Sequence, residues 1–417
     1  MTSRIEADYL IETAFDPRFA AETIAGEQSS GTFVSLPGET PELKARSAAR
    51  IEALDEIGEA AEPSLPGAAR PTGARIRRAH LTLSWPLDNI GPSLPNLMAT
   101  VAGNLFELQQ LSGLRLVDIR LPACFMESYG GPKFGISGTR RLAGVERGPL
   151  IGTIVKPSIG LDAAETADLV RALCEAEIDF IKDDELQSDG AHCPFDDRVR
   201  AVMRVVNASA EKTGKKAMVA FNITGDLDQM RRRHDRVLEC GGTCVMASIN
   251  SVGLVGMIEL TRFSALPIHA HRNGWGYLSR APMLGWSYIA WHKIWRLAGA
   301  DHIHVNGLSN KFSEPDDSVI ASARSCLTPL SQERPCLAMP VFSSGQTIRQ
   351  AAGTFAALGS TDLIFAAGGG VMAHPDGPGA GVKSLREAWR AAMAGIALGD
   401  HAKDHPALAR AMQAFPA

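Results

Sequence analysis

The chain lacks any apolar run of the roughly 18–20 residues that a membrane-spanning helix needs. Its start, MTSRIEADYLIE, lacks the basic and then apolar layout of a signal peptide. It also has no excess of basic residues: Lys and Arg number 42 against 46 Asp and Glu. The net charge of −4 gives no electrostatic reason to expect nucleic acid or a membrane as partner. Any anion site must therefore be local.

Cysteine is scarce as well. The seven cysteines are an odd number scattered over 417 residues, which argues against a disulfide framework and fits a reducing cytoplasm. Cys240 and Cys244 are the closest pair, but no second pair or histidine cluster completes a zinc site there, so we expect structural thiols. The composition, 45% apolar and 21% charged, is typical of a globular protein, and the length predicts two domains or one barrel with an appendage.

Residues 1–130 show strand and helix patterns in no regular order, which predicts an α+β domain. In the first of them, Ile5, Ala7, Tyr9 and Ile11 alternate with mostly polar neighbours, the pattern of a half-buried strand. The other expected elements are strands at 75–84 and 114–120, a loop at 60–73, and a helix that begins near Pro92 and runs to about Phe106.

From about residue 148 the chain alternates short apolar strands with longer amphipathic segments, and the domain from 131 to 417 is expected to be a (β/α)8 barrel. Asp162 and Glu165 form a capping box at the start of one helix. A doubly wound open sheet would show a similar alternation, but nearly every strand ends in polar residues, where a barrel builds its active site. The eight expected strands span 150–157, 179–185, 217–224, 243–250, 267–272, 301–306, 336–345 and 361–370.

The second barrel strand ends in Lys182, Asp183, Asp184 and Glu185. Alternation turns Lys182 and Asp184 to one side, and Glu185 can turn inward where the strand leaves the sheet. Two adjacent carboxylates suit Mg²⁺, and Lys182 either pairs with them or becomes a third anionic ligand as a CO₂ carbamate. A buried ion-pair cluster without metal is the alternative for these residues.

Lys156 ends the first barrel strand, where a lysine can act as acid or base, although a lysine on the rim would show the same pattern. Strands five and six carry His269 and His271, then His302 and His304. Such His–X–His pairs fit a zinc site, but Arg272 directly after the first pair favours an anionic substrate group. We expect His269 and His302 to be core residues.

Strands seven and eight end in Ser343-Ser344-Gly345 and Gly368-Gly369-Gly370. Phosphate groups bind in many barrels on the backbone N–H groups of these last two loops, and glycine lets the backbone approach closely. A glycine run by itself is more often a turn. Lys311, seven residues after His304, lies in a loop that is expected to close over a ligand.

The order and spacing of TIVKP, DFIKDDE, HAHR, DHIHVNGLSNK, PVFSSG and AAGGG resemble the RuBisCO large-chain superfamily, and the segments around Glu27, Thr32 and Asn104 resemble its N-terminal domain. The resemblance implies a ferredoxin-like α+β domain before the barrel. It also implies Mg²⁺ on Lys182 (as carbamate), Asp184 and Glu185, with Lys156 and His271 moving protons. It implies a homodimer, or a larger assembly of dimers, because Glu27, Thr32 and Asn104 would reach the neighbouring subunit's site.

For a small phosphorylated substrate, the resemblance implies two binding ends. One end consists of Arg272, His304 and Ser343. The other consists of Lys311, Thr32, Gly345, Gly368 and Gly369. Four residues depart from the carboxylase pattern: Ser158 replaces the second lysine of KPK, and Phe33, Trp275 and Ser344 replace a tryptophan, a histidine and a glycine. Without the second lysine, the sequence resembles the non-carboxylating RuBisCO-like proteins.

Among the activities of that group, the retained Lys311, Glu27 and Asn104 favour a β-keto acid. The specific expectation is decarboxylation or carbon–carbon hydrolysis of 3-oxo-isoapionate 4-phosphate in apiose breakdown. An enolase or isomerase acting on a methylthio-sugar phosphate in methionine salvage is the alternative within the group. Outside it, a Schiff-base aldolase using Lys156 or Lys182, or a non-catalytic ligand-binding protein, stays open.

Overall fold

The computed structural model describes residues 3–31 and 36–416 and divides into two compact units. Unit 1 is Met1–Gly130 with Gly274–Leu297 and Ser331–Arg334, and unit 2 is Gly131–Asn273 with Ala298–Leu330 and Pro335–Ala417. The two added segments of unit 1 depart from a single boundary near residue 130. Among the described residues, no helix combines the length and apolarity needed to cross a membrane.

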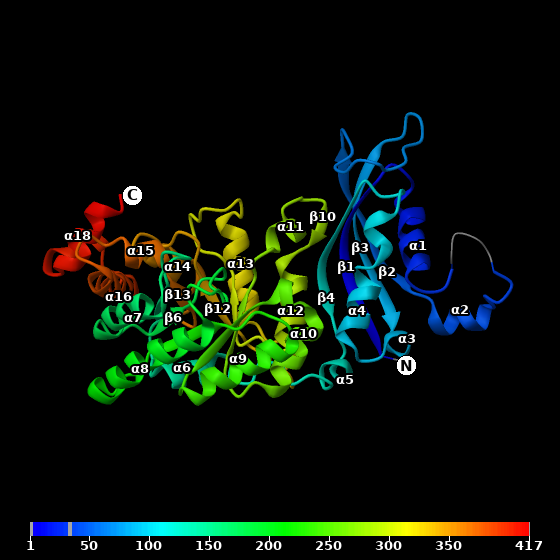
Figure 1. The fold of residues 1–417 in the computed structure, drawn as a ribbon. Helices are drawn as coiled ribbons and strands as arrows, with labels where there is room; N and C mark the ends of the chain where they lie inside the picture. The colour runs from blue at the N-terminus through cyan, green and yellow to red at the C-terminus, as the bar shows by residue number, and fades with distance from the viewer. Residues whose placement is uncertain (1–2, 32–35, 417) are drawn as a thin grey trace. The chain divides into compact units, whose positions relative to one another are not determined.

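Unit 1 is built on a five-stranded mixed sheet in the order β10-β4-β1-β3-β2, with α1 packed against β2 and β3 (Figure 1). β10 pairs with β4 in parallel, and the remaining neighbours are antiparallel. Its elements are β1 (Arg4–Thr13), α1 (Pro17–Glu27), α2 (Pro41–Ser47), β2 (Arg50–Ala60), β3 (Ile76–Pro86), α3 (Leu87–Ile90), α4 (Leu94–Val101), η1 (Asn104–Glu107), β4 (Gly113–Arg120), α5 (Ala123–Met126), α11 (Trp275–Ser279), β10 (Leu284–Trp286) and α12 (Tyr288–Leu297).

The α+β prediction is confirmed, with three corrections. The helix expected to reach Phe106 ends at Val101, because Ala102 and Gly103 leave helical geometry, and a short 3-10 turn follows from Asn104. The strand β2 was not predicted, since most of its residues are exposed and carry no alternating apolar face. Glu12 is one of the polar residues that alternate with Ile5, Ala7, Tyr9 and Ile11, and the alternation predicts an exposed side chain. It is instead fully buried, and Ser64, Ser112 and Arg78 donate to its carboxylate.

Unit 2 is a closed parallel barrel in the order β11-β12-β13-β5-β6-β7-β8-β9, as the sequence predicted (Figure 1). Each expected strand contains one of the eight. The elements are α6 (Gly135–Ala143), β5 (Leu150–Ile154), α7 (Ala163–Glu175), β6 (Phe180–Lys182), α8 (Phe195–Thr213), β7 (Met218–Asn222), α9 (Leu227–Glu239), β8 (Cys244–Ser248), α10 (Ile249–Phe263), β9 (Ile268–His271), β11 (His302–His304), α13 (Asp316–Leu327), β12 (Met339–Phe342), α14 (Gln350–Leu358), β13 (Ile364–Ala366), α15 (Gly368–Met372), α16 (Pro378–Ala394), α17 (Leu398–His401), η2 (Ala402–Asp404) and α18 (Pro406–Ala414).

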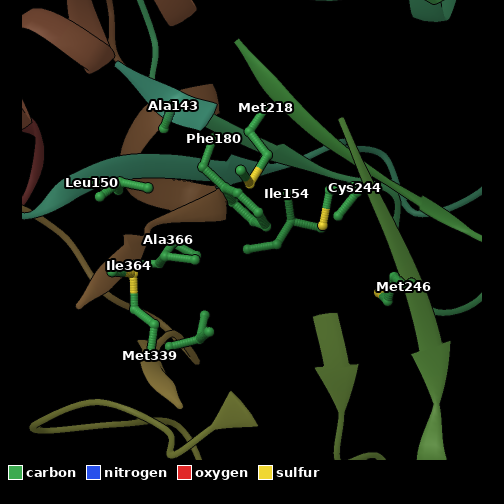
Figure 2. Packing of buried hydrophobic residues seen from close by; sticks show 12 residues of the cluster. Ala143, Leu150, Ile154, Phe180, Met218, Cys244, Met246, Met339, Ile364 and Ala366 are labelled. Carbon is green, nitrogen blue, oxygen red and sulfur yellow. The ribbon is translucent and has the colours of Figure 1, made fainter. Parts of the chain in front are cut away.

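Apolar side chains from the strands fill the core of the barrel (Figure 2). Figure 2 shows Phe180 of β6 and Met218 of β7 converging, and both are fully buried. Gly152 on β5 leaves the room for that ring, because a Cβ at this position would lie 3.1 Å from Phe180. The small residue on one strand thus makes room for the large residue on its neighbour.

Polar residues fix the start of the barrel strands and the first helix after β5. The capping box of α7 forms as predicted, with Asp162 accepting from the backbone N–H of Glu165, and Glu165 accepting from that of Asp162. Asp301, fully buried before β11, accepts from the backbone N–H groups of Phe134, Gly135 and Ile268. The carboxylate therefore ties α6 and β9 to the start of β11.

A buried ion pair holds β6 against α8. Asp183 turns away from Lys182 and Asp184, as strand alternation requires, and accepts from Arg198 at 3.2 Å and from the backbone N–H of Asn222 at 3.0 Å. Both side chains are buried, at 3% and 0% exposure. This ion pair anchors the strand whose end carries the polar cluster described below.

We expect Arg198→Ala to lower the free energy of unfolding by about 3–5 kcal/mol, since it leaves the Asp183 carboxylate buried without its partner. Arg200→Ala is the matched control, because Arg200 lies on the same helix and pairs with Asp197 at the surface. Urea denaturation followed by circular dichroism measures both. Equal losses in the two variants would contradict the assignment.

Candidate active site

Two lysines and two carboxylates meet at the ends of β5 and β6. Lys182, the last residue of β6, is 1% exposed and donates to Glu185 Oε2 at 3.0 Å. Lys156, two residues past β5, donates to Asp184 Oδ2 at 2.5 Å and to Ser158 Oγ at 2.7 Å. The structure thus brings together the four charged residues that the sequence placed at these strand ends.

Burial acts on the acid–base state of this cluster. Burial lowers the pKa of Lys182, while Glu185, Asp184 and Asp183 oppose that shift. Burial also acts to raise the pKa of Glu185, but Lys182 and His271 outweigh it and bring the value down to about 2. Glu185 is therefore a carboxylate at any working pH, which suits a ligand for a hard cation, and Lys182 reaches its neutral amine more readily than an exposed lysine.

The four histidines of β9 and β11 stack through the barrel and stay neutral. His269 Nε2 lies 2.7 Å from His304 Nε2, and His302 Nε2 lies 2.7 Å from Thr139 Oγ1. Burial is the first cause of lowered pKa values, to about 3 for His302 and well below the ordinary range for His269 and His304. The prediction that His269 and His302 belong to the core agrees with their complete burial.

The hydrogen bonds of His304 indicate which of its ring nitrogens carries the proton. His269 Nδ1 has no partner among the described residues, so its proton belongs on Nε2, which donates to His304 Nε2. His304 then carries its proton on Nδ1 and donates to Ser343 Oγ at 3.0 Å. Two of the residues predicted for one substrate end, His304 and Ser343, are therefore in direct contact.

His271 lies between the lysine–carboxylate cluster and the buried histidines. Its Nε2 is 3.4 Å from Glu185 Oε2, and its ring centroid is 4.5 Å from that of His304. Burial and Lys182 lower its pKa to about 4. Its Nδ1 accepts from the backbone N–H of Asn273 at 3.3 Å, so the neutral ring carries its proton on Nε2, the nitrogen that faces Glu185.

Arg272, predicted to bind an anionic group, is 5% exposed and donates to Glu314 Oε2 at 2.6 Å. Glu314 also accepts from Asn306 and Ser318. An anion at Arg272 would therefore share it with a carboxylate that the sequence analysis did not single out. The signal was present, since Glu314 follows Lys311 by three residues in the same loop.

The loops after β11, β12 and β13 approach one another closely. The backbone N–H of Lys311 donates to Ser344 O at 3.2 Å, and a Cβ on Gly345 would lie 3.8 Å from Lys311. A Cβ on Gly370 would meet Gln346 O at 2.6 Å, so only glycine fits there. Gly368 lies next to Lys156, whose Cε would be 3.8 Å from an added Cβ, while Gly369 faces open space.

Ser344 adopts φ 71°, a left-handed backbone conformation that favours glycine, the residue of the carboxylase pattern at this position. Its Oγ donates to Asn306 Oδ1 at 2.8 Å, which offsets part of the backbone cost. The serine therefore keeps the loop geometry of a glycine and adds a bond to the loop after β11.

In unit 1, Asn104 donates to Glu27 Oε1 at 3.4 Å, and both side chains are exposed. The helix α1 ends at Glu27, and Asn104 begins η1. Thr32 and Phe33 lie outside the described residues. Trp275, which stands where the carboxylases have a histidine, is buried in unit 1 and packs against Trp291 with ring centroids 4.9 Å apart.

The His–X–His pairs do not form a zinc site. Over residues 3–31 and 36–416, the cluster of three His, Cys, Asp or Glu ligand atoms within 4.8 Å of one another lies elsewhere, at Glu387, His401 and His405. A closed parallel barrel with lysines and carboxylates at two strand ends, and with close-packed glycine loops at two others, defines a (β/α)8 enzyme with a polar mouth.

Comparisons with known proteins define the family. The ribulose bisphosphate carboxylase large chain matches over its N-terminal domain at residues 7–125 and over its catalytic domain at residues 135–415. A 3-oxo-isoapionate-4-phosphate transcarboxylase/hydrolase of Xanthobacter autotrophicus is 63% identical over 99% of both chains. A 3-oxo-isoapionate-4-phosphate decarboxylase of Rhizobium rhizogenes is 45% identical over 99% of this chain and 98% of the relative.

A solved RuBisCO-like protein from Burkholderia fungorum has a TM-score of 0.93 at 50% identity, with 99% of this chain and 100% of that chain covered. An octameric RuBisCO from Pyrococcus horikoshii has a TM-score of 0.88 at 32% identity, with 98% and 93% covered. The chain belongs to the RuBisCO large-chain family, within the RuBisCO-like group, and the resemblance read from its motifs is confirmed.

We expect the buried histidines to make the fold sensitive to acid. Their folded-state pKa values lie below the value of about 6.5 for an exposed histidine. Unfolding therefore takes up protons, and the stability present above about pH 6.5 is lost as the pH falls toward 4, at up to about 1.4 kcal/mol per pH unit for each histidine.

Denaturation midpoints measured between pH 4.5 and 7.5 test this expectation. His302→Gln removes one of the titrating groups and should reduce the pH slope, whereas His80→Gln, at an exposed position, should leave it unchanged. The same slope in the wild type and in His302→Gln would show that His302 is protonated equally in both states.

Proposed function

We propose that the protein cleaves a carbon–carbon bond of 3-oxo-isoapionate 4-phosphate, releasing its carboxyl group or a carboxyl-bearing fragment. The observation that carries this proposal is the pairing of Lys156 with Asp184 and of Lys182 with Glu185, in a chain 63% identical to a transcarboxylase/hydrolase named for that substrate. A β-keto acid is the substrate class in which such a bond breaks next to a carbonyl.

Lys182, Asp184 and Glu185 fit a Mg²⁺ site. The cluster now contains two ammonium groups and two carboxylates, which balance in charge. Reaction of Lys182 with CO₂ would turn one positive charge into a negative one and leave a surplus of two negative charges, the charge of one Mg²⁺. The lowered pKa of Lys182 favours the neutral amine that reacts with CO₂, so the donor set and the charge both support a carbamate with a divalent cation.

Bound Mg²⁺ would supply Lewis-acid polarisation of the substrate carbonyl. As the carbon–carbon bond breaks, its electron pair moves toward that carbonyl oxygen, and the enolate carbon then needs a proton. The ammonium group of Lys156, 39% exposed and bonded to Asp184 and Ser158, is positioned to donate it. His271 Nε2, beside Glu185, carries the proton of the neutral ring because Nδ1 accepts from Asn273, so it is positioned to donate a hydrogen bond to a substrate oxygen.

The substrate's charged ends have two candidate positions. Arg272, His304 and Ser343 would bind one end, with the Arg272 guanidinium shared between the anion and Glu314. The backbone of Gly345, Gly368 and Gly369 would bind the phosphate, with Lys311 closing from the loop after β11. Ser158 in place of a second lysine gives Lys156 a neutral partner, which argues against CO₂ fixation on ribulose bisphosphate.

We expect purified protein, incubated with Mg²⁺ and bicarbonate, to convert 3-oxo-isoapionate 4-phosphate with release of CO₂ or of glycolate. Lys182→Ala and Glu185→Gln should each lower kcat/KM by at least about 1000-fold, since either change removes a ligand of the polarising cation. Ser344→Gly serves as the control, because it keeps the loop conformation and leaves the cluster intact.

Product analysis by NMR distinguishes the outcomes. No turnover of this substrate, with deuterium exchange on a methylthio-sugar phosphate instead, would replace the proposal by the enolase or isomerase alternative. Borohydride trapping of substrate on Lys156 or Lys182 without added metal would replace it by Schiff-base chemistry.

We also propose that Glu27, Thr32 and Asn104 complete the site of a neighbouring copy in a homodimer or a larger assembly of dimers. Two observations support this assembly: the Glu27–Asn104 pair is exposed, and the Pyrococcus relative is described as octameric. In such a dimer each active site takes residues from both chains.

Mixed dimers test this sharing of residues. Glu27→Ala and Lys182→Ala homodimers should both be inactive, whereas a mixture unfolded and refolded together should regain about a quarter of wild-type activity, because half of the dimers are mixed and hold one intact site of two. A mixture refolded from each variant separately is the control. Absence of complementation from dimers shown to be mixed would contradict the shared site.

A further inference from the structure

Three metal-binding side chains converge among the C-terminal helices, away from the barrel mouth. Glu387 lies on α16, His401 ends α17, and His405 immediately precedes α18. Their ligand atoms all lie within 4.8 Å of one another, and each residue is only partly exposed. The four-residue spacing of the histidines and the carboxylate from a separate helix bring three elements to one point.

Two of the three ligand–ligand distances are close to the edge of a tetrahedral metal site. His401 Nε2 lies 3.0 Å and His405 Nε2 3.2 Å from Glu387 Oε2. Two ligands bound to Zn²⁺ at about 2.0–2.1 Å lie roughly 3.3 Å apart in a tetrahedron. The two imidazole rings are stacked at 4.0 Å with 20° between their planes, so one ring must turn before both Nε2 lone pairs point at a single ion.

The contacts of His405 call for either a second proton on its ring or a metal ion at Nε2. His405 Nδ1 lies 2.6 Å from the carbonyl oxygen of His401, which can only accept, so Nδ1 carries the proton. A neutral His405 then directs the lone pair of Nε2 at the Glu387 oxygen, and two acceptors face each other. Either a second proton on His405 or a metal ion resolves this conflict. Arg390 bonds to the other oxygen, Oε1, at 2.5 Å and leaves Oε2 to the histidines.

We propose that Glu387, His401 and His405 bind Zn²⁺. Two imidazole nitrogens with one carboxylate oxygen form a donor set that suits Zn²⁺ and is unsuited to Mg²⁺, which prefers oxygen ligands alone. The side chains are 15%, 16% and 32% exposed, so a water molecule can reach the fourth position. The site does not take part in the chemistry at the barrel mouth, and its test is independent of the proposed function.

The position of the site indicates what the metal does. α16 packs against α14, α15 and α18 (Figure 1), and α15 contains Gly368 and Gly369. The C-terminal segment already bonds back to this region, because His374 Nε2 donates to Ala407 O and Arg349 donates to Phe415 O and Met412 O. Zn²⁺ would link α17 and the start of α18 to α16, and so stabilise the helices that pack against α15, which contains Gly368 and Gly369.

Zinc titration of the metal-stripped, full-length protein tests the site, with saturating Mg²⁺ present to occupy the carboxylates at the barrel mouth. The wild type should bind one more equivalent of Zn²⁺ than His401→Ala or Glu387→Gln, whose affinity at this site should fall by at least about 100-fold. At Zn²⁺ well above the dissociation constant, the Tm of the wild type should rise by roughly 5 °C, and that of the variants should not. His80→Ala, which removes an exposed histidine elsewhere, should behave like the wild type.

Cobalt substitution gives a second readout that does not depend on variant stability. Co²⁺ bound to the wild type should show the visible absorption of a tetrahedral site, and Zn²⁺ should displace it. Equal zinc stoichiometry and equal Tm shifts in the wild type and His401→Ala, or the absence of tetrahedral Co²⁺ absorption in the wild type, would overturn the proposal. Such results would show that His405 pairs with Glu387 through a second proton on its ring and not through a metal ion.

Discussion

The charge balance at the ends of β5 and β6 is the constraint on which the candidate site depends. Lys182 is nearly inaccessible to water, and a buried ammonium is costly unless it is paired. Glu185 supplies that partner, Asp184 is paired with Lys156, and Asp183 turns outward to Arg198 instead of adding a third negative charge. The four charges of the ion-pair cluster therefore sum to zero. Converting the ammonium of Lys182 into a negatively charged carbamate would leave a net charge of −2, which a divalent cation would balance.

Neutrality extends from this cluster through the barrel. Burial keeps the histidines of β9 and β11 uncharged, so His304 and Ser343 form a chain of directed hydrogen bonds and not of ion pairs. A substrate anion that enters near Arg272 thus meets one localised positive charge, already balanced by Glu314. Because the surrounding histidines are neutral, one localised arginine is enough to form an anion site in a protein with a net charge of −4.

Sequence reasoning was successful wherever one residue type is required by its place on a strand. The strand ends at Lys182, His271 and His304 could be predicted because polar residues follow an apolar, alternating strand at the end where a barrel builds its active site. The sequence could not show that Glu12 is buried, because its partners Ser64, Ser112 and Arg78 come from distant segments. Glu314 lies three residues after Lys311 in the same loop, but its role in pairing with Arg272 was overlooked, since that contact joins residues 42 positions apart.

Glu387, His401 and His405 show the same limit in another form. Two histidines four residues apart near the end of a chain indicate nothing by themselves, and Glu387 is one glutamate on an amphipathic helix. Only the fold places the three together, and only the bond from His405 to the backbone of His401 assigns its proton and leaves a lone pair facing a carboxylate. Because that bond depends on the turn between α17 and α18, whatever cation resolves the conflict is linked to the conformation of the C-terminal segment.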